Sequence, residues 1–247
     1  MRRRFFVERF ERDSASLRDE AAEHLGRVLR AEPGQLYELS DGERVWLARV
    51  EGVALSKRGP NRIDFALVEP LAVVAPVLRV ELLVSVVKFD RFEWALEKAA
   101  ELGADEIIPL AAARTDKPLL AAAGKRHERW ERILLESAQQ ARRLRPPRLH
   151  AAQPPEKAFA QSSALLKTLL SERRDAPRLR DILTGREGSA ASSAALAIGP
   201  EGGWTEEEIA AARACGFLEA SLGENILRTE TAVIASLAIL TFALEQS

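Results

Sequence analysis

The apolar pattern after residue 78 is the feature that most constrains the fold. Short apolar runs of strand length alternate there with longer segments in which apolar residues recur at helical spacing. Strands that alternate with helices form a parallel sheet with helices packed on its faces. We therefore expect an α/β domain over residues 73–247. Its strands are expected at residues 80–87, 106–110, 167–171, 194–198 and 218–222, and its main helices at 89–102 and 125–144.

The first 72 residues carry a different pattern, in which short alternating segments are separated by turns. Residues 35–39 and 45–50 flank Asp41-Gly42, a dipeptide typical of a hairpin turn, and residues 62–68 alternate again. Several short strands joined by turns indicate a small β-barrel, which we place at residues 1–72. The proline-containing stretch 69–76 is the expected linker.

Composition excludes few classes of function. The chain has 247 residues, with 36 Lys and Arg against 37 Asp and Glu, so its total charge does not indicate a nucleic-acid partner. The single cysteine, Cys215, has no disulfide partner within the chain, which fits a reducing compartment. No signal peptide is recognised, and the apolar stretch 231–244 is too short to span a bilayer. We expect a cytoplasmic protein that does not enter membranes.

The strongest local motif is Gly199-Pro200-Glu201-Gly202-Gly203, which follows the strand expected at residues 194–198. Glycines in such a turn let a ligand approach the backbone amides. Thr205 then forms a helix N-cap with Glu208 at the capping-box position, so a tight strand-to-helix turn without a ligand is the alternative. The motif matches neither a P-loop nor Gly-x-Gly-x-x-Gly, which disfavours an NTPase or a dehydrogenase.

A second motif follows the last expected strand and opens the C-terminal helix. Arg228 and Glu230 lie there on the carboxyl side of a strand, where α/β sheets bind their ligands. The alternative is a helix cap with a surface ion pair.

Together the two motifs closely resemble the RsmE family of 16S ribosomal RNA (uracil-N3)-methyltransferases, which belong to the SPOUT superfamily. The second motif matches as Leu222-Gly223-x-x-Ile226-Leu227-Arg228-Thr229-Glu230-Thr231-Ala232. The resemblance covers nearly the whole chain, with further matches at Arg4-Phe5-Phe6-Val7, Lys88, Glu101-Leu102-Gly103, Ile108-Pro109-Leu110, Gln140, Arg143 and Pro147. The chain departs from the family where Glu224-Asn225 replaces the usual Pro-Arg and Ala141 replaces the usual serine.

The resemblance implies an N-terminal PUA-like, RNA-binding β-barrel and a C-terminal SPOUT α/β domain with a trefoil knot. It also implies S-adenosylmethionine as the cofactor, held in the knot by the backbone of three loops. The cofactor-binding residues that it indicates are Leu170, Ile198, Gly199, Pro200, Gly202, Gly203, Leu222, Gly223, Ile226 and Leu227.

The implied activity is methylation of N3 of a specific uridine in 16S ribosomal RNA, in the decoding region of the small subunit. N3 must lose its proton before it can accept a methyl group, so a base or an anion-stabilising group is needed. Arg228 is the expected anion stabiliser, and either Glu230 or Glu201 is the expected proton acceptor. The choice between the carboxylates stays open, and Glu201 has the alternative of stabilising the following helix dipole.

The expected partner is 16S RNA or the assembled 30S subunit, bound by a homodimer. Residues 125–148 carry eight basic against three acidic side chains, and Arg142, Arg143 and Arg145 lack neighbouring glutamates in sequence. The full set of expected RNA-binding residues is Arg4, Arg30, Lys88, Arg114, Arg142, Arg143 and Arg145. No metal site is expected, because the histidines have no companions at ligand spacing.

Two other functions fit parts of this pattern. A 2′-O-ribose methyltransferase of the SPOUT superfamily would share the cofactor site. A non-catalytic ribosome-binding factor would share the basic segment, but the intact Gly199–Gly203 motif argues against it.

Overall fold

The computed structural model describes residues 3–56, 59–73, 76–184 and 191–244, and the chain divides into two compact units. The first unit contains the chain up to residue 75 together with Ala138–Pro146. The second unit contains Pro76–Ser137 and everything from Pro147 onward. The sequence-based boundary at 72/73 placed residues 138–146 with the second unit instead.

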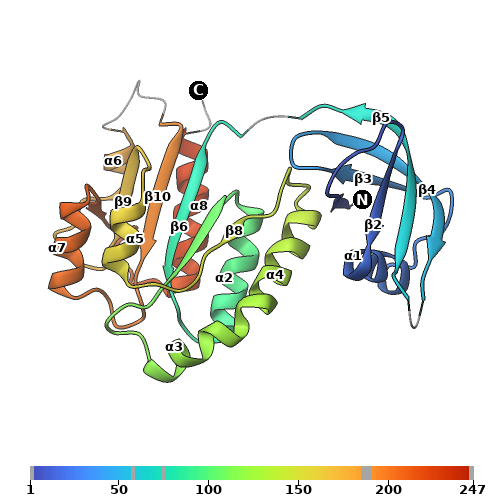
Figure 1. The fold of residues 1–247 in the computed structure, drawn as a ribbon. Helices are drawn as coiled ribbons and strands as arrows, with labels where there is room; N and C mark the ends of the chain where they lie inside the picture. Colours follow the sequence, from blue (N-terminus) through green and yellow to red (C-terminus); the bar gives the residue numbers. More distant parts are fainter. Residues whose placement is uncertain (1–2, 57–58, 74–75, 185–190, 245–247) are drawn as a thin grey trace. The chain divides into compact units, whose positions relative to one another are not determined.

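The first unit is built on an open, curled five-stranded sheet of order β1-β3-β4-β5-β2 (Figure 1). β1 runs parallel to β3, and the other neighbours are antiparallel. β1 and β2 are the two edges of the described sheet, so the small β-barrel expected from the sequence is present only as a half-barrel. The elements are β1 (Arg4–Phe6), β2 (Ser14–Arg18), α1 (Asp19–Glu23), the π-helical turn η1 (His24–Val28), β3 (Leu36–Ser40), β4 (Val45–Ala54) and β5 (Arg62–Leu71).

The predicted hairpin is confirmed as β3 and β4, with Gly42 at φ +88° in its turn. The predicted linker is wrong at its start, because β5 continues through Pro70 to Leu71. Proline fits there because β2 pairs only with the first half of β5, up to Ala66, and a residue without an N–H is tolerated on an unpaired edge.

The second unit contains a six-stranded, wholly parallel sheet of order β11-β9-β10-β6-β7-β8 (Figure 1). This confirms the expected parallel α/β architecture. β10 lies between β6 and β9, so the strand order changes direction at that place. The strands are β6 (Arg79–Ser85), β7 (Glu106–Leu110), β8 (Arg148–Leu149), β9 (Leu166–Leu170), β10 (Ser193–Ile198) and β11 (Leu218–Ala220).

Helices cover both faces of this sheet because the strands are apolar on both sides, as buried parallel strands are. Alternate residues of β6 show this: Leu82 belongs to the core cluster that contains residues of α2, α4, α6 and α8, whereas Leu83 belongs to the cluster that contains residues of α5 and α7. The helices are α2 (Phe89–Glu101), α3 (Lys117–Ala123), the 3₁₀ turn η2 (Gly124–Arg126), α4 (His127–Gln140), α5 (Pro155–Gln161), α6 (Leu179–Thr184), α7 (Glu206–Ala214) and α8 (Thr229–Leu244).

α4 is shorter than the helix expected at residues 125–144. It ends at Gln140, and Arg142 has a φ of +54°, a conformation that stops a helix. None of the helices in the described ranges is long and apolar enough to cross a membrane.

The parallel arrangement brings the carboxyl ends of β9, β10 and β11 to one edge of the sheet. The loops that follow these strands therefore gather at the change in strand order, where open α/β sheets bind ligands.

Candidate cofactor pocket and active site

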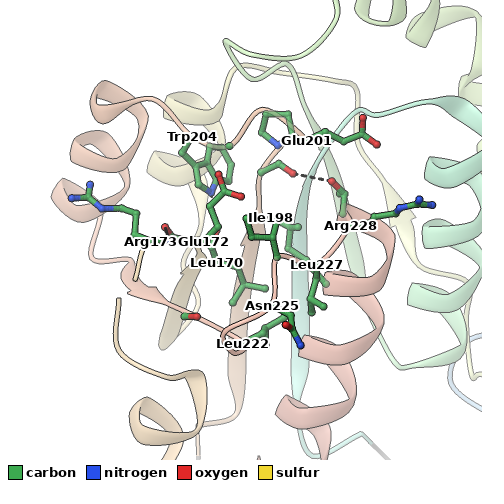
Figure 2. Close-up of a pocket in the computed structure, with 18 of the residues that line it drawn as sticks. Leu170, Glu172, Arg173, Ile198, Glu201, Trp204, Leu222, Asn225, Leu227 and Arg228 are labelled. Atoms are coloured by element: carbon green, nitrogen blue, oxygen red, sulfur yellow. Dashed lines mark hydrogen bonds between the residues drawn. The ribbon is translucent and has the colours of Figure 1, made fainter. Parts of the chain in front are cut away.

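A pocket of about 580 Å³ lies where the loops after β9, β10 and β11 meet (Figure 2). This volume is within the range of small-molecule sites. Nine of the ten cofactor residues expected from the sequence line it: Leu170, Ile198, Gly199, Pro200, Gly203, Leu222, Gly223, Ile226 and Leu227.

The three loops are fastened to one another around Gly199. The indole Nε1 of Trp204 donates a hydrogen bond to the Leu170 carbonyl at 2.9 Å. The Thr229 hydroxyl donates to the Gly199 carbonyl at 3.2 Å, which ties α8 to the end of β10. A Cβ atom on Gly199 would lie 3.0 Å from the Trp204 ring, so a side chain there would require the indole to shift by a few tenths of an ångström.

Gly202 is the expected cofactor residue that does not line the pocket. A Cβ atom there would lie 3.2 Å from the Cβ of Arg114, and Arg114 Nη1 donates to the Gly202 carbonyl at 2.9 Å. Gly202 thus makes room for Arg114. Arg114, expected from the sequence as an RNA contact, is part of the pocket wall.

The capping box predicted at the start of α7 is confirmed. The Glu208 amide donates to the Thr205 hydroxyl at 3.2 Å, and the Glu208 carboxylate accepts from the Thr205 amide at 2.9 Å. The other carboxylate oxygen of the buried Glu208 accepts from the Ala113 amide at 2.8 Å. The turn after β10 is therefore a helix cap and a pocket wall at once.

Charged side chains stand at both sides of the pocket. Figure 2 shows Glu172 and Arg173 on one side and Glu201 and Arg228 on the other. Arg173 lies 3.1 Å from Glu206, and this carboxylate, with further acidic neighbours, raises the pKa of the guanidinium. Glu224 and Asn225, which stand where the resembled family usually has Pro-Arg, also line the pocket.

The three expected catalytic residues occupy different environments. Arg228 and Glu201 line the pocket. The Glu230 side chain is only 7% exposed and is not among the lining residues. Its Oε2 is buried and has no hydrogen-bond partner among the described residues.

Arg91 is a pocket residue that the sequence reasoning missed. It forms an ion pair with Glu201, and its Nε lies 3.9 Å from Glu230 Oε1. The sequence could have indicated Arg91, because it follows β6 closely and so lies on the carboxyl side of a strand, as Arg228 does.

Residues 74–241 match the family model described as RNA methyltransferase domain. A curated relative from Synechocystis, ribosomal RNA small subunit methyltransferase E, is 34% identical over 90% of this chain and 71% of its own. This chain is a member of the RsmE family.

Two solved structures have the same fold across 98% of this chain and 98% of their own. One is the ribosomal RNA small subunit methyltransferase E of Neisseria gonorrhoeae bound to S-adenosyl methionine, at 30% identity and a TM-score of 0.83. The other is a Legionella pneumophila protein in complex with the same cofactor, at 30% identity and a TM-score of 0.80.

The RNA-binding residues expected for this RsmE-family chain divide between the two units. Lys88 is exposed just before α2, whereas Arg30 and Arg145 are exposed in the first unit. Arg4 lies 3.0 Å from the buried Glu38 of β3, and Arg142 lies 3.5 Å from the same carboxylate. Arg142 has no acidic neighbour in sequence, as expected, but the sheet supplies a carboxylate that is distant in sequence. Arg143 is partly buried.

Proposed function

We propose that this chain transfers a methyl group from S-adenosylmethionine to N3 of a uridine in 16S ribosomal RNA, in the decoding region of the small subunit. The observation that carries the proposal is the pocket itself: three strand-end loops bring an apolar wall, close-packed glycines and a group of arginines and carboxylates together. Membership of the RsmE family and the names of its relatives support methylation of small-subunit ribosomal RNA.

The residues of the pocket fit this cofactor. Leu170, Ile198, Leu222 and Leu227 offer an apolar wall of the kind that adenine packs against, and Gly199 and Gly203 leave backbone groups accessible. The charged groups on either side suit the polar ends of the molecule. When bound, the cofactor supplies the methyl group.

Arg228 and a carboxylate carry the rest of the chemistry. Arg228 lines the pocket and stabilises negative charge that develops on a uracil oxygen as N3 loses its proton. Glu201 or Glu230 accepts that proton, directly or through water.

We further propose that the first unit is a PUA-like RNA-binding domain and that the substrate is 16S RNA or the 30S subunit in the cytoplasm. The exposed Arg30, Lys88 and Arg145 are suited to phosphate contacts. The trefoil knot and the homodimer of the family stay predictions for this chain.

Transfer of a tritiated methyl group to small subunits and to free 16S RNA, followed by nucleoside analysis, tests the proposal. The expected product is 3-methyluridine. A 2′-O-methyl nucleoside would identify a ribose methyltransferase, and RNA binding without any methyl transfer would identify a non-catalytic factor.

A further inference from the structure

Three charged side chains from separate segments of the second unit meet beside the pocket. Arg91 lies in the first turn of α2, Glu201 in the loop after β10 and Glu230 in the first turn of α8. The guanidinium of Arg91 stands between the two carboxylates, paired with Glu201 through Nη1 and 3.9 Å from Glu230 through Nε.

The three side chains differ in how far a substrate can reach them. Glu201 is 46% exposed and Arg91 is 26% exposed, and both line the pocket. Glu230 is 7% exposed and does not line it. A group of the substrate in the pocket can therefore meet Glu201 and Arg91, whereas Glu230 stands behind Arg91.

We propose that these residues form a positioning series in which Glu230 fixes Arg91 and Arg91 fixes Glu201. Glu201 is then the carboxylate that accepts the N3 proton, and Glu230 acts only through Arg91. This inference rests on the proposed function, which leaves open whether Glu201 or Glu230 accepts the proton, and it assigns that role to Glu201.

The physical basis is the cost of burying a charge. A buried carboxylate is costly unless it is paired, and the first turn of α8 together with Arg91 gives Glu230 favourable electrostatic surroundings. Glu230 in turn orients Arg91, because the attraction of a buried, fixed anion restricts the positions that the guanidinium can take. Without Glu230, the exposed Glu201 would be the one acidic partner left to Arg91 among the described residues.

A double-mutant cycle on turnover separates this role from direct catalysis by Glu230. Glu230→Gln and Arg91→Met should each lower kcat by about 100-fold, the size of effect that a misplaced catalytic group produces. The double variant should be no slower than the slower single variant, because residues that act through each other are not additive. Arg91→Lys, which keeps a cation, should recover part of the turnover.

Titration calorimetry with S-adenosylmethionine shows whether each variant keeps a folded pocket, and its affinity should stay near that of the parent. Arg129→Met breaks another Arg–Glu pair, with Glu93 at 2.8 Å, outside the pocket, and should keep the parent's turnover. If Arg91→Met does not fold, the turnover of Glu230→Gln can still be compared with that of the double variant, which carries neither charge of the Arg91–Glu230 pair.

A readout independent of turnover is the Arg91 Nε–H resonance, assigned by its loss in Arg91→Lys. Its exchange with solvent should be faster in Glu230→Gln than in the parent, because the buried anion no longer restrains the Arg91 side chain. Equal exchange rates, or a Glu230→Gln effect on kcat that is as large in Arg91→Met as in the parent, would overturn the inference. A parent protein that transfers no methyl group to small-subunit RNA would overturn the proposed function instead.

Discussion

At the scale of single residues, the pocket depends on how closely the backbone and the Trp204 ring approach each other. The ring would lie 3.0 Å from a Cβ on Gly199, and its indole nitrogen holds the Leu170 carbonyl. Any side chain at Gly199 must push this ring or the loop aside. Gly202 has a different neighbour, Arg114, so the two glycines of one motif have separate roles.

Gly199→Val should therefore weaken S-adenosylmethionine binding by at least about tenfold, equivalent to about 1.4 kcal/mol. The added methyl groups displace Trp204 and with it the wall that Leu170 forms. Titration calorimetry measures the affinity. Gly124→Ala is the matched control, because a Cβ there meets nothing within 4 Å, and it should bind as the parent does. An unchanged affinity in Gly199→Val would contradict the placement of the cofactor.

At the scale of elements, α7 is joined to two loops by one carboxylate. Glu208 closes the capping box with Thr205 and also accepts from the Ala113 amide, next to the pocket residue Arg114. The cap therefore stabilises the helix and holds the segment that precedes α3.

Thr205→Ala should lower the free energy of unfolding by about 1 kcal/mol, because the Glu208 amide loses its side-chain acceptor. Thr205→Ser keeps the hydroxyl and should stay within a few tenths of a kcal/mol of the parent. Denaturant unfolding monitored by circular dichroism gives both values. Equal stability of the alanine and serine variants would mean that the hydroxyl contributes nothing to the cap.

At the scale of the whole molecule, the last three residues of α4 and the basic segment that follows them belong to the first unit. Ala138–Pro146 groups with the curled sheet, where the Ser40 hydroxyl donates to the Leu144 carbonyl at 2.6 Å. Glu38 neutralises part of the charge of this segment through Arg142. Arg145 is exposed and is the better phosphate contact of the two.

Arg145→Ala should weaken RNA binding and lower the slope of log affinity against log salt by about 0.7–0.9, the amount expected for one lost phosphate contact. Filter binding to 16S RNA at several salt concentrations measures the slope. Arg49→Ala is the control, because Arg49 already pairs with Glu51 at 2.9 Å, and it should change the slope less. Equal slopes for the parent and Arg145→Ala would remove Arg145 from the RNA-binding surface.

We also expect the protein to be a dimer. Trp94 of α2 and Ile239 and Phe242 of α8 are 45%, 38% and 73% exposed, and the two helices pack against each other. Phe242→Glu should shift sedimentation at micromolar concentration from dimer toward monomer. Leu165→Glu, at an exposed apolar residue outside these helices, should not. A parent that sediments as a monomer would contradict the expectation.

The sequence alone determined the class of the second unit, the places of most of its strands and the two motifs that line the pocket. It could do so because strand and helix periods, glycine turns and helix caps are local properties of the chain. The same locality explains the correct hairpin through Gly42 and the capping box of α7.

Only the tertiary structure decided what depends on residues far apart in sequence. The partners of Arg142 and Arg91, Glu38 and Glu201, lie about a hundred residues from them along the chain. The first sheet is a half-barrel because its edge strands, β1 and β2, do not pair with each other. The pocket forms where it does because β10 lies between β6 and β9 in the second sheet. The sequence motifs make Glu230 and Glu201 equally good candidates for the proton acceptor. The structure distinguishes them by exposure, because the Glu230 side chain is buried and that of Glu201 is exposed. Which charged groups pair, and how deeply each carboxylate is buried, are set by tertiary packing between residues far apart in sequence.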